Sequence, residues 1–172
     1  MTELHDSLLA AHDTTADDDD RAGQYLTFYL AGEIYGVDIL KVQEIRSWDP
    51  VTPIPNTGEA LLGVLNLRGT IIPIVDLRQY FDLDPGSIDS TTVVVVLRVA
   101  SGGVTRIMGV LVDGVSDVHH LVSDDLRNAP VVGGLADGSV VALADVGDRV
   151  ITLLDSDLLL GRGDTATTEG AG

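Results

Sequence analysis

Apolar and polar residues alternate in short segments along most of this chain, which is the pattern of β-strands with one buried face. In the first half, the pattern predicts strands at residues 25–30, 34–37, 44–47, 61–67 and 70–75. Two of the gaps are short and contain glycine, namely Ala31-Gly32 and Arg68-Gly69, so each is expected to close a hairpin. A proline-rich loop at 50–55 is expected to separate the two hairpins.

The second half shows the same kind of pattern, with strands predicted at residues 92–99, 104–112, 114–121, 140–143 and 149–154. Residues 92–99 are apolar at almost every position, which is typical of a strand buried on both faces. Residues 129–134 are expected to form a loop. Short helices are expected at 38–42, at 77–81, where Asp76 can cap the first turn, and at 156–160.

An internal repeat relates the two halves. Residues 36–45 recur as 109–118 without a gap, so that Gly36 falls on Gly109. Residues 71–76 match 150–155 at a slightly longer offset. Two copies of one small β-unit predict an all-β fold of two small barrels lying side by side. Subdomain 1 is expected at about 24–84 and subdomain 2 at about 88–160, and the sequence leaves open whether strands cross between them.

Composition restricts the function. The 172 residues include no cysteine, which excludes disulfides and thiolate chemistry and suits a reducing cytoplasm. No apolar stretch is long enough to span a membrane, and the N-terminus does not have the pattern of a secretory signal. Residues 1–23, which are acidic, and residues 161–172 are expected to be disordered tails.

The net charge of −17, with Lys41 the only lysine, opposes binding to nucleic acid or to anionic lipid. Such acidity keeps a protein soluble, and it also suits a cytoplasm with high salt. Composition does not decide between these two explanations.

Candidate catalytic and metal-binding residues do not form a recognisable set. His119 and His120 are adjacent, so at most one faces any given site, and the other histidines lie in the N-terminal tail. Asp113-Gly114 looks distantly like an aspartic-protease loop, but the matching position in the first copy lacks a second such pair, so a turn is the simpler interpretation. The aspartate run 17–20 lacks the ligand spacing of a calcium loop. We therefore expect no cofactor and no metal.

One charged run lies in an apolar setting and is the best candidate for a binding surface. Asn66, Arg68 and Gly69 occupy a predicted hairpin tip, and Glu44 lies in a preceding strand close to other charged residues. The simpler interpretation is a solvated turn. Arginine beside exposed aliphatic residues is, however, typical of protein interfaces.

The body of the chain, about 24–160, resembles the CheW-type chemotaxis coupling proteins. The resemblance is carried by residues 25–28, 35–46 (YGVDILKVQEIR), 63–69 (GVLNLRG), 72–78 (IPIVDLR), 110–118 (VLVDGVSDV) and 147–149 (GDR). It implies two SH3-like five-stranded β-barrels with short helices. It also implies a non-enzymatic adaptor that joins the cytoplasmic tip of methyl-accepting chemoreceptors to the regulatory domain of the CheA histidine kinase. An adaptor of this kind is cytoplasmic and works at membrane-associated receptor arrays.

By the same resemblance, Val42, Glu44 and Arg68 match receptor-contact positions in a groove between the barrels, and Asn66 and Gly69 belong to the same hairpin tip. Kinase contact is expected through apolar surface on the barrels, without assignment to residues. The chain has no room for a kinase domain and no receiver pattern after residue 160, so we expect a stand-alone coupling protein.

The sequence departs from the family pattern at Pro53, at 128, at 131–134 and at Ala142. These departures affect the expected loop contacts and leave the fold prediction unchanged.

Two functions from other classes are alternatives to the adaptor: a hydrolase or small-ligand enzyme on a barrel scaffold, and a nucleic-acid-binding barrel. The first needs convergent polar groups and the second a basic groove.

Overall fold

The computed structural model describes residues 23–55, 58, 60–84, 86–128 and 139–161. The first half contains β1 (Gly23–Leu30), β2 (Glu33–Asp38), the 3-10 turn η1 (Ile39–Lys41), β3 (Val42–Ser47), β4 (Leu61–Leu67), β5 (Thr70–Asp76) and helix α3 (Leu77–Tyr80). The second half contains β6 (Val93–Ser101), β7 (Val104–Val112), β8 (Gly114–Leu121), η2 (Ser123–Asp125), β9 (Leu126–Arg127), β10 (Val140–Val146) and β11 (Arg149–Leu154). A last helix covers 156–161. The all-β prediction is confirmed.

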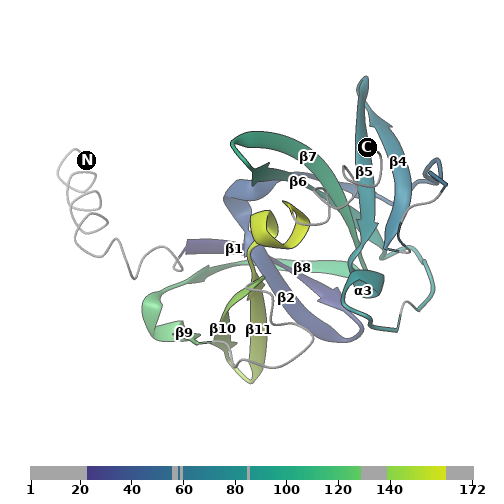
Figure 1. The fold of residues 1–172 in the computed structure, drawn as a ribbon. Coiled ribbons are helices and arrows are strands. Elements are labelled where there is room, and N and C mark those ends of the chain that lie inside the picture. The colour runs from purple at the N-terminus through teal and green to yellow at the C-terminus, as the bar shows by residue number, and fades with distance from the viewer. Residues whose placement is uncertain (1–22, 56–57, 59, 85, 129–138, 162–172) are drawn as a thin grey trace, which may run out of the picture.

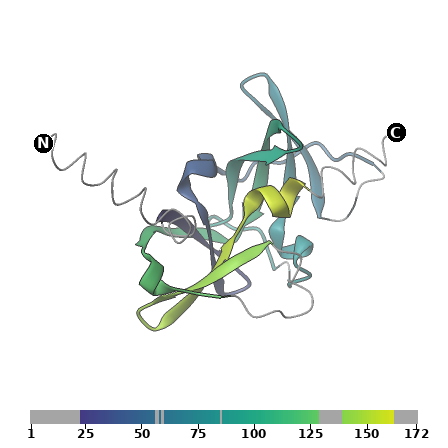
Figure 2. The same cartoon turned by 60° about the vertical axis from the view of Figure 1, so that its left-hand side comes forward.

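The strands form two sheets, drawn side by side in Figures 1 and 2. Sheet A has the order β8-β1-β2-β11-β10-β9, and sheet B has the order β3-β6-β7-β5-β4. Sheet A therefore has six strands rather than the expected five, because the two-residue strand β9 pairs with β10. The sequence pattern did not predict β9 or η2, since elements of two or three residues are too short to show a period.

Strands cross between the two halves of the chain, which answers the question that the sequence left open. Sheet A takes β1 and β2 from the first half, and sheet B takes β6 and β7 from the second half. The sheets therefore do not follow the division expected near residues 84–88. The internal repeat still holds, because β2 pairs in parallel with β11 just as β7 pairs in parallel with β5.

The two matched glycines explain why these parallel strands can pack closely. A Cβ atom on Gly36 would lie 3.0 Å from a methyl carbon of Leu153 in β11, and one on Gly109 would lie 2.6 Å from a methyl carbon of Ile74 in β5. Both distances are below ordinary van der Waals contact, so a side chain at either position would require the Leu153 or Ile74 side chain to move. The repeated glycine thus leaves room for an apolar side chain of the neighbouring strand in both parallel pairs.

Among the residues that the structure describes, three apolar cores are found, and the largest lies between the sheets. It includes Phe28 from sheet A, Val95 and Leu97 from sheet B, and Leu159 from the last helix. Each sheet also has a smaller core of its own. Strand β6 separates the large core from the core of sheet B: Val95 faces the former and Val96 the latter, both fully buried. The predicted two-sided burial of residues 92–99 is confirmed.

The predicted hairpin turns and helix starts are also observed. Ala31 and Gly32 connect β1 to β2, both with positive φ. Asp76 caps α3, because its Oδ1 accepts a hydrogen bond from the backbone N–H of Arg78 at 3.0 Å. In the part of the chain that the structure describes, no helix is long and apolar enough to cross a membrane. The expected N-terminal tail (apart from Gly23), most of the C-terminal tail and the loop at 129–134 lie outside the described residues.

Candidate functional site

The β4–β5 hairpin tip is built by its own sequence. Arg68 has a φ of 49° and Gly69 a φ of 89°, so two successive residues adopt the left-handed conformation of a tight hairpin turn. The backbone N–H of Gly69 donates a hydrogen bond to Asn66 Oδ1 at 2.9 Å, which holds the turn from inside. The Arg68 side chain, 66% exposed, therefore projects from a fixed backbone.

Arg68 also connects the two edges of sheet B. Its Nη2 donates to Glu44 Oε2 on β3, the strand at the opposite edge from β4. An isolated bridge also joins Val64 of β4 to Thr52, in the segment that follows β3. The sheet is thus drawn into a barrel, with the Arg68–Glu44 ion pair across its seam.

The charges at this seam stabilise one another. The hydrogen bond from Arg68 is the main reason that the pKa of Glu44 lies below its usual value, and a second contribution comes from Arg46, whose Nη1 lies 3.5 Å from Glu44 Oε1. Partial burial of the Glu44 carboxylate opposes the shift. Within the described residues, Arg46 Nε is buried without a hydrogen-bond partner. Glu44 is therefore ionised and bound by two guanidinium groups at neutral pH.

Val42 does not join this cluster directly. A β-bulge between Val42 and Glu44 shifts the register against β6, so that Val42 lies opposite Leu97 and Glu44 opposite Val96. These two partners face different cores, and Val42 packs against the core between the sheets. The structure thus brings together Glu44, Asn66, Arg68 and Gly69, with Val42 on the side of the core between the sheets. That Val42, Glu44 and Arg68 line one groove stays a prediction.

A second arginine–carboxylate cluster was missed by sequence reasoning. Arg78 Nε and Nη2 each donate to the Asp76 carboxylate at 3.0 Å, and Arg78 Nη1 lies 2.9 Å from Asp113 Oδ1. Asp113 Oδ2 in turn accepts from the backbone N–H of Ala31 at 2.7 Å. Arg78 and Asp76 are buried, and the Asp76 bond is the main cause that raises the pKa of Arg78.

This buried cluster ties the sheets to each other, because Asp76 ends β5 of sheet B and Ala31 lies in the β1–β2 turn of sheet A. Interpreting Asp113-Gly114 as a simple turn was incomplete, since the chain bends there but the aspartate carries this contact. The closely spaced Asp76 and Arg78 were a visible signal of pairing. Nothing in the local sequence pointed to Asp113 as the third member.

The candidate histidines and carboxylates of the described residues do not gather into a metal-binding group. The described residues contain no group of three or more histidine, cysteine, aspartate or glutamate side chains that could hold a metal ion. His119 and His120 lie on β8, an edge strand of sheet A, with His119 half-buried and His120 exposed. The other two histidines and the aspartate run 17–20 lie outside the described residues.

Comparison with known proteins identifies the module. The model of the CheW-like domain matches residues 24–163. The chemotaxis protein CheW of Klebsiella aerogenes is 44% identical over 147 residues, which cover 85% of this chain and 86% of that protein. The crystal structure of the scaffolding protein TtCheW from Thermoanaerobacter tengcongensis matches with a TM-score of 0.72 and 28% identity, covering 80% of this chain and 87% of that one. The chemotaxis protein CheA of Salmonella typhimurium is 33% identical over 127 residues, covering 68% of this chain and 18% of that protein.

Proposed function

This chain belongs to the CheW-like family and is a chemotaxis adaptor rather than an enzyme; from that premise we propose that it joins the cytoplasmic tips of methyl-accepting chemoreceptors to a CheA-type histidine kinase. Its work is to hold two partners at a fixed geometry. The receptor is expected to bind at the Arg68–Glu44 seam, and the kinase regulatory domain to bind elsewhere on the barrels. In the cell, this places the protein in the cytoplasm at receptor arrays.

The observation that supports the receptor site is the fixed but exposed Arg68. The turn holds its backbone, Glu44 holds its guanidinium, and two-thirds of the side chain remains accessible. Val42, half-buried two residues before Glu44, adds an apolar contact on the side of the second barrel. A receptor helix that presents aliphatic side chains could pack on Val42 and on the aliphatic stem of Arg68.

The kinase contact is supported by homology between modules. Part of the CheA sequence resembles this chain, so the kinase carries a related two-barrel unit. Apolar residues outside the seam, such as Leu40 at 74% exposure, would supply a surface for contact with that unit.

A two-partner pull-down tests the proposed function. The full chain is immobilised and offered a receptor cytoplasmic fragment, the CheA regulatory domain, or both together. We expect each partner to be retained alone and both to be retained together. Retention of neither, or competition in which one partner always displaces the other, would contradict an adaptor that holds both at once.

A further inference from the structure

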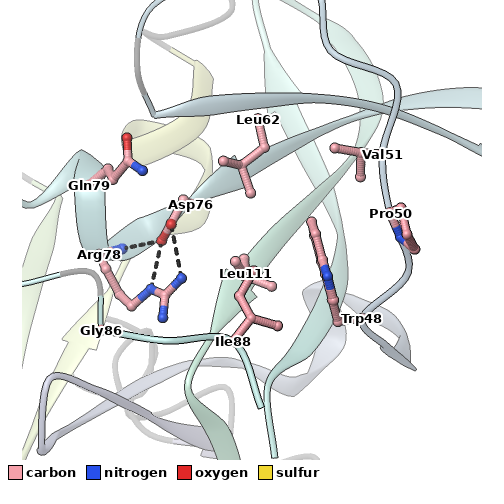
Figure 3. Close-up of a pocket in the computed structure, with 10 residues that line it drawn as sticks. All are labelled: Trp48, Pro50, Val51, Leu62, Asp76, Arg78, Gln79, Gly86, Ile88 and Leu111. Atoms are coloured by element: carbon pink, nitrogen blue, oxygen red, sulfur yellow. Dashed lines mark hydrogen bonds and ion pairs between the residues drawn. The ribbon is translucent and has the colours of Figure 1, made fainter. Parts of the chain in front are cut away.

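A cavity of about 390 Å³ opens at the end of sheet B away from the Arg68 tip. Figure 3 shows Trp48 on one side and the Asp76–Arg78 pair on the other, with Leu111 and Ile88 between them. Leu62 also lines it. Its volume lies within the range of ligand pockets, and its walls are mainly apolar with a few polar groups.

The internal repeat provides a comparison for this cavity. A smaller cavity of about 130 Å³, lined by residues of both halves, has Asp155 and Asp157 at the repeat positions of Asp76 and Arg78. There, Lys41 Nζ donates to Asp157 Oδ2 at 2.8 Å, an ion pair between two residues that line the cavity. No such link crosses the larger cavity in the described residues, because Arg78 turns back to Asp76 and Asp113.

The rim of the larger cavity carries a large apolar side chain that is partly exposed to solvent. Ile88 is 46% exposed although it lines the cavity. Together with the half-buried Trp48, it resembles the aromatic and aliphatic rim of a pocket that accepts a side chain from a partner.

The charge around the cavity is negative. Two carboxylates, Asp76 and Asp113, surround the single guanidinium of Arg78, which leaves a net charge of −1 in that cluster. Asp89 is exposed and adjoins the lining residue Ile88 in sequence, and Asp49 is exposed, adjoins Trp48 and has its Oδ2 3.8 Å from Arg46 Nη2. Hydrogen bonds from Thr91 lower the pKa of Asp89 and keep it ionised.

From the open volume, the exposed isoleucine and this charge, we propose that the cavity receives one bulky apolar side chain from a cationic segment of a partner polypeptide. The apolar side chain would lie among Trp48, Leu62 and Leu111, with Ile88 covering it. Basic residues on either side of it in the partner would lie near Asp49 and Asp89. The pocket is separate from the Arg68 seam, so the inference does not depend on the receptor assignment.

The single tryptophan makes the proposal directly measurable, because Trp48 is the only one in the chain and lies in the wall of the cavity. The probe is a short synthetic peptide with one phenylalanine flanked by lysine and glycine, titrated against the full chain in about 0.15 M potassium chloride. The matched probe replaces the phenylalanine with alanine and keeps every charge. We expect a saturable shift of Trp48 fluorescence with the phenylalanine peptide and at least about tenfold weaker binding of the alanine peptide.

Two serine variants locate the binding. Ile88→Ser removes the aliphatic rim and should weaken the phenylalanine peptide about tenfold. The control Ile71→Ser changes another exposed isoleucine, 60% accessible on β5 and outside the cavity, and should leave binding unchanged. Both variants should melt like the parent chain, since both positions are exposed. Equal binding of the two peptides, equal weakening by both variants, or no saturable shift up to about millimolar peptide would each overturn the proposal.

Discussion

Two arginine–carboxylate pairs lie at opposite ends of sheet B, and they differ in what surrounds them. Arg68 pairs with Glu44 at the hairpin tip with 66% of its side chain exposed, whereas Arg78 pairs with Asp76 and Asp113 with only 3% exposed. In water-rich surroundings an ion pair adds little to stability, but a buried charge without its partner is strongly destabilising. The same kind of ion pair therefore leaves a guanidinium accessible to solvent at one end of sheet B and links the two sheets to each other at the opposite end.

The largest effect is expected where a carboxylate is buried with no arginine at all. Val95 is fully buried in the core between the sheets, so Val95→Asp would place an unpaired charge there. We expect a loss of several kcal/mol, a large share of a total stability of about 5–15 kcal/mol. Urea denaturation measures this loss. A soluble variant with an almost unchanged unfolding midpoint would show that the core of β6 is assigned wrongly.

Arg78→Met should come next, because it removes the guanidinium from the buried Asp76 while keeping an apolar stem. The expected loss in unfolding free energy is about 3–5 kcal/mol. The double variant Asp76→Asn/Arg78→Met keeps a capping oxygen and removes the buried charge, so it should recover part of the loss. If the single variant were as stable as the parent chain, the buried pair would not be the link between the sheets that we infer.

Exposed arginines should behave differently in the same assay. Arg68→Ala is expected to change the unfolding free energy by less than about 1 kcal/mol, the usual range for exposed pairs. Arg127→Ala is the matched control, because Arg127 Nε lies 2.9 Å from Asp145 Oδ2 and the arginine side chain is 54% exposed. If Arg68→Ala lowered the unfolding free energy as much as Arg78→Met, the two ion pairs at the opposite ends of sheet B would not differ in their contribution to stability.

These contrasts mark what the sequence could and could not predict. The two-sided burial of β6, the turn at Arg68-Gly69 and the cap at Asp76 each depend on neighbouring residues, so the local pattern contained them. Residues 35 positions apart form the Arg78–Asp113 contact, the parallel β5–β7 pairs span the same separation, and the parallel β2–β11 pairs span a much longer one. Local periodicity carries no information about such partners, and the bulge that turns Val42 away from Glu44 leaves no signal in the residue pattern either.

The pKa of Glu44 tests whether the Arg68–Glu44 ion pair forms in solution, and its expected effect on stability is small. Since folding lowers the pKa of Glu44 below its usual value of 4.5, chiefly through Arg68, its contribution to stability is present above about pH 4.5 and is lost as the pH falls through the folded pKa. Titration of the Glu44 side chain by NMR should give a midpoint below 4.5 in the parent chain, and Arg68→Ala should move it upward. An identical midpoint in both proteins would show that the ion pair is absent in solution.

Salt concentration should affect the exposed ion pair and the stability of the whole acidic chain. Raising potassium chloride from about 0.01 M to 1 M shortens the screening length from about 30 Å to about 3 Å, which weakens the exposed Arg68–Glu44 pair and also the repulsion within a chain of net charge −17. If the acidity is an adaptation to salt, the melting temperature should rise over this range. A flat or falling melting temperature would leave solubility as the explanation of the acidity.

The most direct test of the adaptor account is Arg68→Ala titrated separately against a receptor cytoplasmic fragment and against the CheA regulatory domain. Because the exposed guanidinium is proposed to contact the receptor alone, receptor affinity should fall by about 2 kcal/mol, or roughly thirtyfold, while kinase affinity stays unchanged. Arg127→Ala in the same titrations should leave receptor affinity as it is. Equal weakening of Arg68→Ala toward both partners, or full receptor affinity, would contradict the assignment of the seam to the receptor.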